Sequence, residues 1–480
     1  MSGQVWLLLI VLVPIVGAFS LPLFGLISER LRNIFALVLV LVSFGCSTMA
    51  LIPLLNGQAP YFFVSFFEIA GINMSFGLMA DWLAVFMAMT STLVGAVIVF
   101  YSFGYINHYK NQNEYYLMVV LFIGAMMGIV LSTNLIFLYI FWEIAAICCW
   151  RLIGFFRKDE YVRKADKAMM ITVFGAVAML LGFIILYSQT GTFDLTQMGG
   201  IALTFPVILL IMIGIFSKSA TLPLHTWLPD AGVAPSPVTS LLHAAVLVKI
   251  GVYVFARLFI INFELPDVWH TIIPVVAGVS ALVSAGAAIV ENDLKRIIAY
   301  STVSQLGFIF LGLSAGSELA LAGGLLYILM HSIAKGGLFL CAGIIEQNTK
   351  TKDIRQMGGL METMPVTGIA FLICALSVMG IPPLGGFFSK YMVIAGTVNA
   401  GQPWIAVVFI LGAIMTIVYL MRLFVLMFLG EPRIAAKEGS NTMVISVVIL
   451  AGLSVAAGIL IYFPSNFVTM ILSQAGVVIK

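Results

Sequence analysis

The sequence predicts an all-α polytopic membrane protein with about fourteen transmembrane helices. Of its 480 residues, 62% are hydrophobic and 9% are charged, and the mean hydropathy is +1.14. Soluble domains carry about a quarter charged residues, so little of this chain is expected outside the bilayer. The second observation is a series of long apolar runs, because about twenty apolar residues are needed to cross a membrane. The third is a pair of runs that prolines interrupt.

The apolar runs place the spans in chain order. The first run, Val5–Phe24, favours a retained span over a signal peptide, because no basic residue precedes it and no small-residue cleavage site follows it. The last residues, Pro464–Lys480, predict a short tail or an interfacial helix. The expected spans are 4–25, 31–55, 78–103, 115–133, 135–155, 167–188, 205–229, 237–263, 271–290, 296–314, 319–345, 365–398, 404–430 and 441–463.

Two of these spans cannot run straight through the bilayer. The seventh carries Lys218 shortly before Pro223, and the twelfth carries Pro382 and Pro383 shortly before Lys390. Proline removes a backbone donor and clashes with the preceding turn, so each helix breaks there. Broken helices in the bilayer need protein or water around the freed backbone groups. A pair of them in the two halves of a chain points to an inverted-repeat transporter and its ion site.

Positive residues orient the chain. Lysines and arginines gather in alternate loops, for example at Arg157, Lys295 and Arg355, while the opposite loops and the ends carry only Lys480. By the positive-inside rule both termini are expected on the non-cytoplasmic side, which agrees with an even number of spans. The net charge of +3 gives no footprint of nucleic-acid binding.

Ionisable residues inside the predicted spans are costly and are hypotheses for functional residues. Glu143 is the one acid clearly in mid-span, whereas Asp81, near a span end, favours a structural or capping role. The arginines Arg151, Arg257 and Arg422 lie nearer span ends, where snorkelling is the ordinary explanation. Lysines and histidines lie deeper, at Lys218, Lys249, Lys335, Lys390, His243 and His331.

This set of groups is suited to moving protons. Burial disfavours the charged form of both lysine and glutamate, and a neighbouring opposite charge reverses that effect. Moving the partner away therefore changes which group holds the proton. His331 and Lys335 are four residues apart and share one helix face, whereas His243 and Lys249 are six apart and face different neighbours. Structural ion pairs and hydrogen-bonded core histidines are the alternative for each group.

No cofactor is expected in this chain. Its five cysteines form no Cys-x-x-Cys pair, so an iron–sulfur cluster held by the chain alone is not predicted. Its five histidines are not paired with acids at ligand spacing, so a metal site is not predicted either.

Two segments carry a resemblance to a known family. Lys218–Ala231 reads KSATLPLHTWLPDA and Glu291–Gly307 reads ENDLKRIIAYSTVSQLG. The chain resembles, over about residues 75–430, the antiporter-like subunits shared by respiratory complex I, membrane-bound energy-converting hydrogenases and Mrp-type cation/proton antiporters. The resemblance implies two inverted five-helix repeats with broken helices seven and twelve. It divides the chain into three N-terminal helices (1–114), two repeats (115–263 and 271–430) and a last helix with a short tail (431–480).

The resemblance also implies a proton path. Glu143 and Lys218 are expected to form a switchable ion pair, and Lys390 occupies the exit position. Protons are expected to enter from the cytoplasm through the first half and to leave through the second. The implied proton-translocation residues are Glu143, Lys218, Lys249, His243, His331, Lys335 and Lys390.

The functional hypothesis is an antiporter-like subunit of a complex I-related, redox-driven pump in a prokaryotic cytoplasmic membrane. It would move protons, or exchange Na⁺ for H⁺, within a membrane-bound hydrogenase or an NADH or ferredoxin dehydrogenase. Further antiporter-like membrane subunits, peripheral redox subunits and lipid are the expected partners, and no nucleic acid. Redox catalysis is not expected in this chain, and the short tail implies no long lateral arm. The alternatives are an Mrp-type Na⁺/H⁺ antiporter subunit without redox partners, a stand-alone secondary transporter, and a structural subunit that does not pump.

Overall fold

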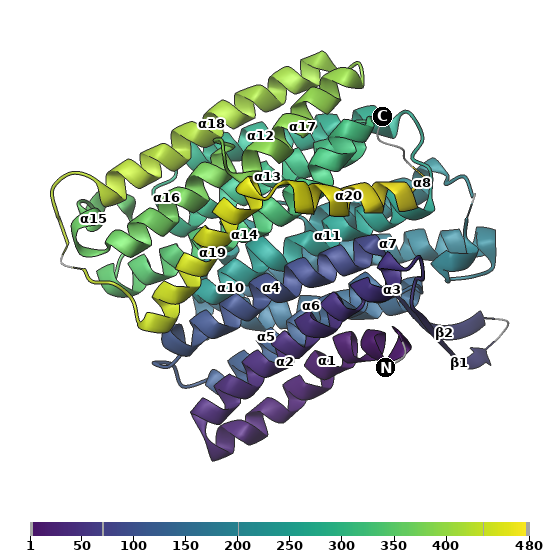
Figure 1. The fold of residues 1–480 in the computed structure, drawn as a ribbon, viewed down its shortest axis with the longest axis horizontal. Helices are drawn as coiled ribbons and strands as arrows, with labels where there is room; N and C mark the ends of the chain where they lie inside the picture. Colours follow the sequence, from purple (N-terminus) through teal and green to yellow (C-terminus); the bar gives the residue numbers. More distant parts are fainter. Residues whose placement is uncertain (1–2, 70–71, 200, 435, 477–480) are drawn as a thin grey trace. The chain divides into compact units, whose positions relative to one another are not determined.

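The protein is mainly helical, and a β-hairpin interrupts the series of helices (Figure 1). A computed structural model describes residues 3–69, 72–199, 201–434 and 436–476. Within these residues, twelve helices are long and apolar enough to cross a membrane. Two shorter apolar helices, α8 (Phe205–Lys218) and α16 (Pro365–Met379), are the first parts of the predicted broken spans. The polytopic helical class is confirmed, while the total of fourteen spans and the inverted repeats stay predictions.

Contacts divide the chain into two compact units, each with its own core. The first unit consists of Met1–Ala96, Lys110–Ser219 and Val246–Leu265, and the second of Val97–Tyr109, Ala220–Ala245 and Pro266–Lys480.

In the first unit, α5 forms the core, because nearly all of its side chains are buried between α1 and α6. The helices of this unit are α1 (Gly3–Ile27), α2 (Glu29–Met49), α3 (Leu51–Leu55), the first part of α4 (Trp82–Tyr105), α5 (Gln112–Leu131), α6 (Leu135–Ile153), α7 (Asp159–Thr190), η1 (Leu195–Gln197), α8, α11 (Leu247–Ala256) and the π-helical segment η4 (Arg257–Asn262).

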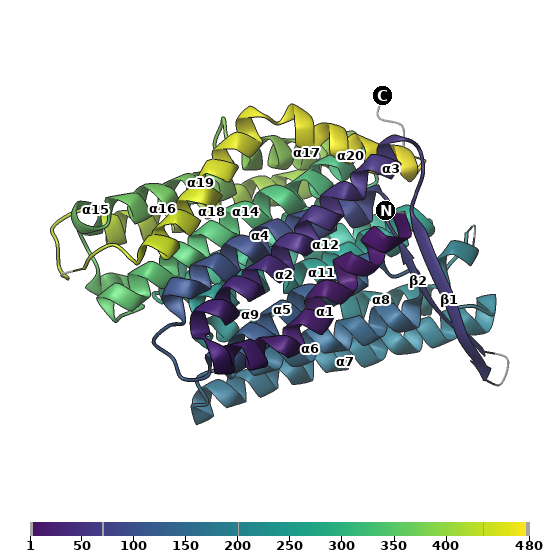
Figure 2. The same cartoon turned by 60° about the horizontal axis from the view of Figure 1, so that its bottom comes forward.

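A β-hairpin between α3 and α4 was not predicted. Strands β1 (Tyr61–Ile69) and β2 (Ile72–Met79) pair antiparallel, as Figure 2 shows. An isolated two-stranded hairpin is marginally stable in water, so contacts with the rest of the unit are needed. Phe76 supplies one of them, with its ring centre 4.9 Å from that of Phe137 on α6. The hairpin thus depends on tertiary packing that hydropathy does not reveal.

In the second unit, α14 is the core helix and packs against α13, α16, α17 and α19. The predicted tail forms α20, which also packs on α14. The elements are α9 (Trp227–Asp230), η2 (Ala231–Val233), α10 (Ser236–Ser240), the π-helical segment η3 (Leu241–Ala245), α12 (Trp269–Val290), α13 (Leu294–Ser314), α14 (Glu318–Thr349), η5 (Ile354–Gln356), α15 (Leu360–Thr363), α16, α17 (Gly385–Asn399), α18 (Pro403–Phe428), α19 (Asn441–Ile459) and α20 (Tyr462–Gln474).

Side-chain caps set the starts of three helices, α6, α13 and α14, that carry site or network residues. Asn134 accepts from the Ile136 amide before α6, Asp293 caps α13, and Ser317 caps α14. These side chains satisfy amides that the first helical turn leaves unpaired. The register of each helix, and hence the direction of its polar side chains, is fixed at its first turn.

Glycine lets the two parts of the second broken helix meet. A Cβ on Gly386 of α17 would overlap the backbone carbonyl of Ser377 on α16, whereas one on Gly412 of α18 would have its nearest neighbour at 3.7 Å. We therefore expect Gly386→Ala to lower thermal stability by about 1–3 kcal/mol through overpacking. Gly412→Ala is the matched control, expected to be neutral or slightly stabilising. Thermal unfolding of the purified variants in detergent measures both; equal stabilities would contradict the close approach.

Candidate functional site

Both predicted helix breaks are present. α8 ends at Lys218, and a loop with a cis Leu222–Pro223 bond follows. α16 ends at Met379, and a turn with a cis Pro382–Pro383 bond leads into α17. In each case the carbonyl end of a helix is left inside the protein, where its orphan carbonyls favour a cation.

Lys218 occupies the carbonyl end of α8. Its side chain is fully buried. The ammonium donates to the backbone oxygen of Trp142 at 3.2 Å and lies 5.1 Å from the centre of the Trp142 ring. A carbonyl dipole and an aromatic face both stabilise a desolvated cation. The first predicted lysine is therefore held at a site suited to a positive charge.

Glu143 follows Trp142 on α6, so Lys218 contacts the residue next to the predicted partner. Within the described residues, Lys218 and Glu143 make no direct ion pair, and the buried Oε1 of Glu143 has no hydrogen-bond partner. A buried carboxyl oxygen without a partner is costly and marks a place where a proton, water or cation is expected. The structure brings the two side chains into one neighbourhood without joining them.

Lys249 lies in the same unit, fully buried near the start of α11. Ser219, which follows Lys218, donates to the backbone oxygen of Val248 at 3.1 Å. Lys218 thus bonds to the residue before Glu143, and its neighbour Ser219 bonds to the residue before Lys249. Three predicted residues of the first unit are neighbours along these links.

His243 belongs to the second unit, within η3. Its ring centre lies 4.4 Å from that of Phe339 on α14, and in the described residues neither imidazole nitrogen has a hydrogen-bond partner. Such π-helical turns are frequent at functional sites because they redirect side chains. His243 therefore packs against the helix that carries His331 and Lys335.

Lys335 and His331 share a face of α14, as their spacing predicts. The Lys335 ammonium donates to Ser301 Oγ at 2.5 Å and to the Ile298 oxygen at 3.2 Å, both on α13. The His331 ring packs edge-on against Tyr327, one turn earlier. Both site residues are buried.

Lys390, on α17, reaches back across the second break. Its ammonium donates to the Val378 oxygen of α16 at 2.7 Å and lies 4.5 Å from the centre of the Phe308 ring. Lys390 therefore supports the carbonyl end of the preceding half-helix. Lys218 forms the carbonyl end of its own half-helix, so a lysine and a helix end come together at both breaks.

A buried polar network in the second unit was not predicted. Its side chains come from α13, α14 and α18, and one turn separates Ser301 from Gln305. Polar residues at this spacing inside an apolar helix were a signal available in the sequence. The network residues are Ser301, Gln305, Tyr327, Thr416 and Tyr419.

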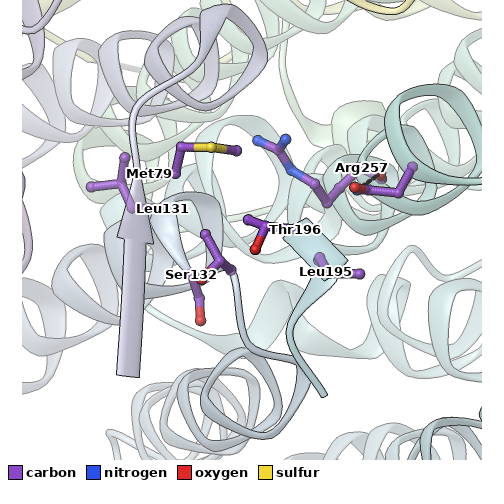
Figure 3. Close-up of a pocket in the computed structure, with 8 residues that line it drawn as sticks. Met79, Leu131, Ser132, Leu195, Thr196 and Arg257 are labelled. Atoms are coloured by element: carbon purple, nitrogen blue, oxygen red, sulfur yellow. Dashed lines mark hydrogen bonds between the residues drawn. The ribbon is translucent and has the colours of Figure 1, made fainter. Parts of the chain in front are cut away.

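Arg257 does not snorkel, contrary to the expectation from its place near a span end. It is buried and forms a two-pronged ion pair with Asp81. Asp81 also accepts from the Ala84 amide and caps α4, as expected of it. A pocket of about 60 Å³ lies beside this pair; Ser132 and Thr196 contribute polar groups to its lining (Figure 3).

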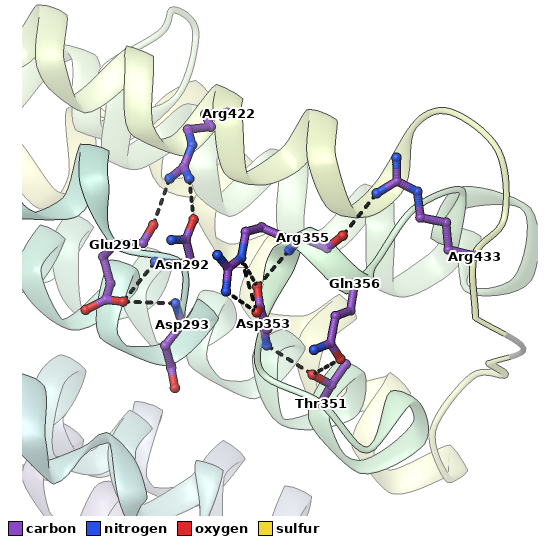
Figure 4. Close-up of polar contacts among 9 residues, drawn as sticks. All are labelled: Glu291, Asn292, Asp293, Thr351, Asp353, Arg355, Gln356, Arg422 and Arg433. Carbon is purple, nitrogen blue, oxygen red and sulfur yellow. Dashed lines mark hydrogen bonds and ion pairs between the residues drawn. The ribbon is translucent and has the colours of Figure 1, made fainter.

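Charged and polar side chains in the loops at one end of the second unit form a hydrogen-bond network (Figure 4). Arg422 donates to the Glu291 oxygen and to Asn292, and Arg433 donates to the Arg355 oxygen. The side-chain hydrogen bond from Arg355 lowers the pKa of Asp353 below its usual value. This network joins the α12–α13 turn, the η5 segment and the loop after α18 (Figure 4). Because its charges are exposed or only partly buried, it stabilises these loops only modestly.

Among the described residues, no group of three or more His, Cys, Asp and Glu side chains is arranged to hold a metal ion.

The fold and site define a class: a polytopic helical membrane protein with two proline-broken helices, each with a buried lysine at its break. Residues 132–416 match the family "NADH:quinone oxidoreductase/Mrp antiporter, TM", and residues 66–116 match "NADH-Ubiquinone oxidoreductase (complex I), chain 5 N-terminus". The chain belongs to this NADH:quinone oxidoreductase/Mrp antiporter family. The predicted resemblance is confirmed.

Named relatives come from both branches of the family. The chain is 35% identical over 451 residues to an Na(+)/H(+) antiporter subunit of Alkalihalophilus pseudofirmus, covering 85% of this chain and 55% of that protein. It is 35% identical over 469 residues to NAD(P)H-quinone oxidoreductase subunit 5 of Paulinella chromatophora, covering 90% of this chain and 69% of the other. The chain thus spans about half the length of several curated relatives it matches.

Two solved structures share the whole fold. A chain of the membrane-bound sulfane sulfur reductase, an archaeal respiratory membrane complex, superposes with a TM-score of 0.90 at 23% identity, covering 99% of this chain and 98% of the other. A chain of the Mrp complex from Dietzia sp. DQ12-45-1b gives 0.86 at 20% identity, covering 98% of each. These likenesses concern the fold.

Proposed function

We propose that this chain is the ion-translocating, antiporter-like subunit of a larger membrane complex, and that it moves protons or exchanges Na⁺ for H⁺. The observation that carries the proposal is the pair of buried lysines at the two helix breaks, each bonded to a backbone carbonyl. Ionisable groups at membrane depth are costly, and each is by default a hypothesis for a functional residue.

Lys218 and Glu143 supply the proposed switch. When the carboxylate approaches the ammonium, each charge stabilises the other, and both groups stay ionised. When the carboxylate moves away, desolvation disfavours the charged ammonium, which releases its proton to an acceptor further along the path and becomes neutral. The carbonyl of Trp142 holds the ammonium one residue from Glu143, so the proposed switch is a shift between α6 and α8 that makes or breaks the pair.

The proposed path continues through Lys249 in the first unit and through His243, His331, Lys335 and Lys390 in the second. Protons enter through the first half from the cytoplasm and leave near Lys390. The two inverted repeats, 115–263 and 271–430, are part of this proposal. Both termini then lie on the non-cytoplasmic side of a prokaryotic cell membrane, as the distribution of lysine and arginine supports.

The partners proposed are other membrane subunits, including further antiporter-like chains, with peripheral redox subunits. Relatives named as subunits of a quinone oxidoreductase and of Na⁺/H⁺ antiporters support both a redox-driven pump and an Mrp-type antiporter. The redox-driven pump is the primary proposal. The Mrp-type antiporter without redox partners is the second candidate, favoured by the antiporter names among the relatives.

One experiment tests the function and separates the two candidates. The complex is purified gently from its native membrane, its nickel, iron and flavin are measured, and it is reconstituted into vesicles with a pH-sensitive dye inside. Iron with nickel, or iron with flavin, together with a donor-dependent pH change, supports a redox-driven pump. No metal or flavin, with a pH change on adding NaCl, supports an Mrp-type antiporter. No pH change under either condition contradicts the proposed function.

Lys390 provides a sharper test of the exit. The resemblance implies either a lysine or a glutamate at this position, so we expect Lys390→Glu to keep more proton translocation than Lys390→Ala. Glutamate still titrates and, when protonated, again offers a donor toward the Val378 carbonyl, whereas alanine does neither. Initial rates of pH change in native membrane vesicles measure both variants. Equal rates for the two would argue against a titratable exit residue.

A further inference from the structure

A chain of hydroxyl groups leads away from Lys335. The ammonium donates to Ser301 Oγ at 2.5 Å, and Ser301 lies 2.8 Å from the hydroxyl of Tyr419. Tyr419 donates to Thr416 at 3.3 Å, and Thr416 donates to the Gly412 carbonyl at 2.7 Å. All these donating side chains are fully buried. A hydroxyl both accepts and donates, so a proton can pass along the chain as far as Thr416.

The chain ends against an amide. Gln305 Nε2 donates to Thr416 Oγ1 at 3.1 Å and to the Tyr419 hydroxyl at 3.3 Å, while its Oε1 accepts from Tyr327 at 2.7 Å. The hydrogen bonds fix the orientation of the amide, because Thr416 donates its own hydrogen to Gly412 and must accept from Gln305. Gln305 is thus the bridge between the Lys335 chain and Tyr327.

Tyr327 is in turn the neighbour of the second lysine. The Lys390 ammonium lies 5.6 Å from the centre of the Tyr327 ring. Tyr327 is fully buried, like Gln305. The described contacts therefore run from Lys335 through hydroxyls to Gln305, and from Gln305 through Tyr327 to Lys390.

An amide is a poor link in such a path. Its nitrogen only donates hydrogen bonds and its oxygen only accepts them, so neither end can both take up and release a proton. To pass a proton, the oxygen would have to gain one while the nitrogen lost one, which produces an imidic acid of much higher energy. A hydroxyl or a carboxyl group in the same place would exchange its proton readily.

We infer that Gln305 is a positioning residue that blocks proton transfer between Lys335 and Lys390 in this conformation. Transfer then requires the amide to rotate out of the network so that water connects Tyr419 with Tyr327. The inference rests on the proposed function and deepens it: a pump must prevent protons from running back between strokes, and Gln305 supplies that block in the second half.

The competing interpretation is that Gln305 merely satisfies buried hydroxyls. Gln305→Glu separates the two, because a protonated carboxyl group has nearly the shape of the amide, keeps the acceptor for Tyr327 and keeps one donor toward Thr416 or Tyr419. As Oε1 takes the proton of Tyr327, Oε2 passes its own to Tyr419, and the C=O and C–O bonds exchange places. Tyr419 passes its own proton to Ser301, and Ser301 passes its own to Lys335 in its neutral form. Tyr327 regains a proton from the Lys390 ammonium, which becomes neutral. A structural role predicts no change in conductance from this substitution.

The test measures passive proton leak in native membrane vesicles that hold the intact complex. A potassium gradient with valinomycin sets the membrane potential, and an internal pH dye reports proton flow without any substrate. We expect Gln305→Glu to raise the leak severalfold over wild type and to lower net pumping. Adding Lys390→Ala should remove the extra leak. Gln402→Glu, a partly buried amide outside the network that donates to the His270 oxygen, is the matched control and should leak like wild type.

Gln305→Ala is the second variant, because removing the amide leaves room for water between Tyr327 and Tyr419. It is also expected to leak. Leak and pumping are compared in each variant that reaches the membrane at the normal level. If such a variant leaks and pumps like wild type, Gln305 does not block proton transfer. A leak equal in Gln305→Glu and Gln402→Glu also overturns it. Absence of pumping in the wild-type complex would instead contradict the proposed function, and the leak of the Gln305 variants does not bear on that result.

Discussion

Replacing Lys218 with alanine is expected to reduce proton translocation by the intact complex about a hundredfold, the lower range for loss of a general acid–base group. The chain should still accumulate in the membrane. The reason is chemical: Lys218 is the proposed group that gains and releases a proton at the carbonyl end of α8. The measurement is the initial rate of pH change in native vesicles, normalised to the amount of the chain.

Two further variants decide whether the lost translocation reflects a lost proton-transfer group or a general defect of the complex. Glu143→Gln keeps the shape of the side chain and removes its charge, and the proposed switch predicts a similar loss of translocation. Lys164→Ala removes a lysine that pairs with the exposed Glu160, and it should translocate at the wild-type rate. Wild-type translocation in Lys218→Ala and Glu143→Gln would rule out the switch pair. Loss in all three variants would point to a general defect in assembly.

The class of fold could be predicted because the bilayer imposes it. Hydropathy and proline alone place α8 and α16 as half-helices and put Lys218 and Lys390 beside the breaks. The relevant information is local, since a proline removes a backbone donor and clashes with the preceding turn. The β1–β2 hairpin was missed because it depends on packing against α6.

Contacts between distant residues were also missed. Gln305 and Thr416 are 111 residues apart, and Arg257 and Asp81 are 176 apart. Each residue alone has an ordinary explanation on its own helix: a polar residue in a small-residue segment, or an arginine near a span end. Only the pairing of helices shows that Gln305 bridges two tyrosines and that Arg257 is almost fully desolvated.

The Arg257–Asp81 pair leads to the largest expected effect on stability. Arg257→Met should destabilise the chain by about 3–5 kcal/mol, because it leaves the Asp81 carboxylate buried without its counter-charge. Asp81→Asn should be similarly harmful, although asparagine keeps the cap on the Ala84 amide. The midpoint of thermal unfolding of the purified chain or complex in detergent measures both.

The double variant separates a lost charge partner from a lost shape. If the cost is an unpaired buried charge, Asp81→Asn together with Arg257→Met recovers much of the stability, since no charge is left buried. Arg151→Met is the matched control: Arg151 pairs with Glu114, but its side chain is 36% exposed against 4% for Arg257. A pair that water reaches is worth about 0–1 kcal/mol, so this variant should unfold almost like wild type. If the double variant is as unstable as the sum of the single ones, the pair contributes through its packing beside the pocket, and its charges do not decide the stability of the first unit.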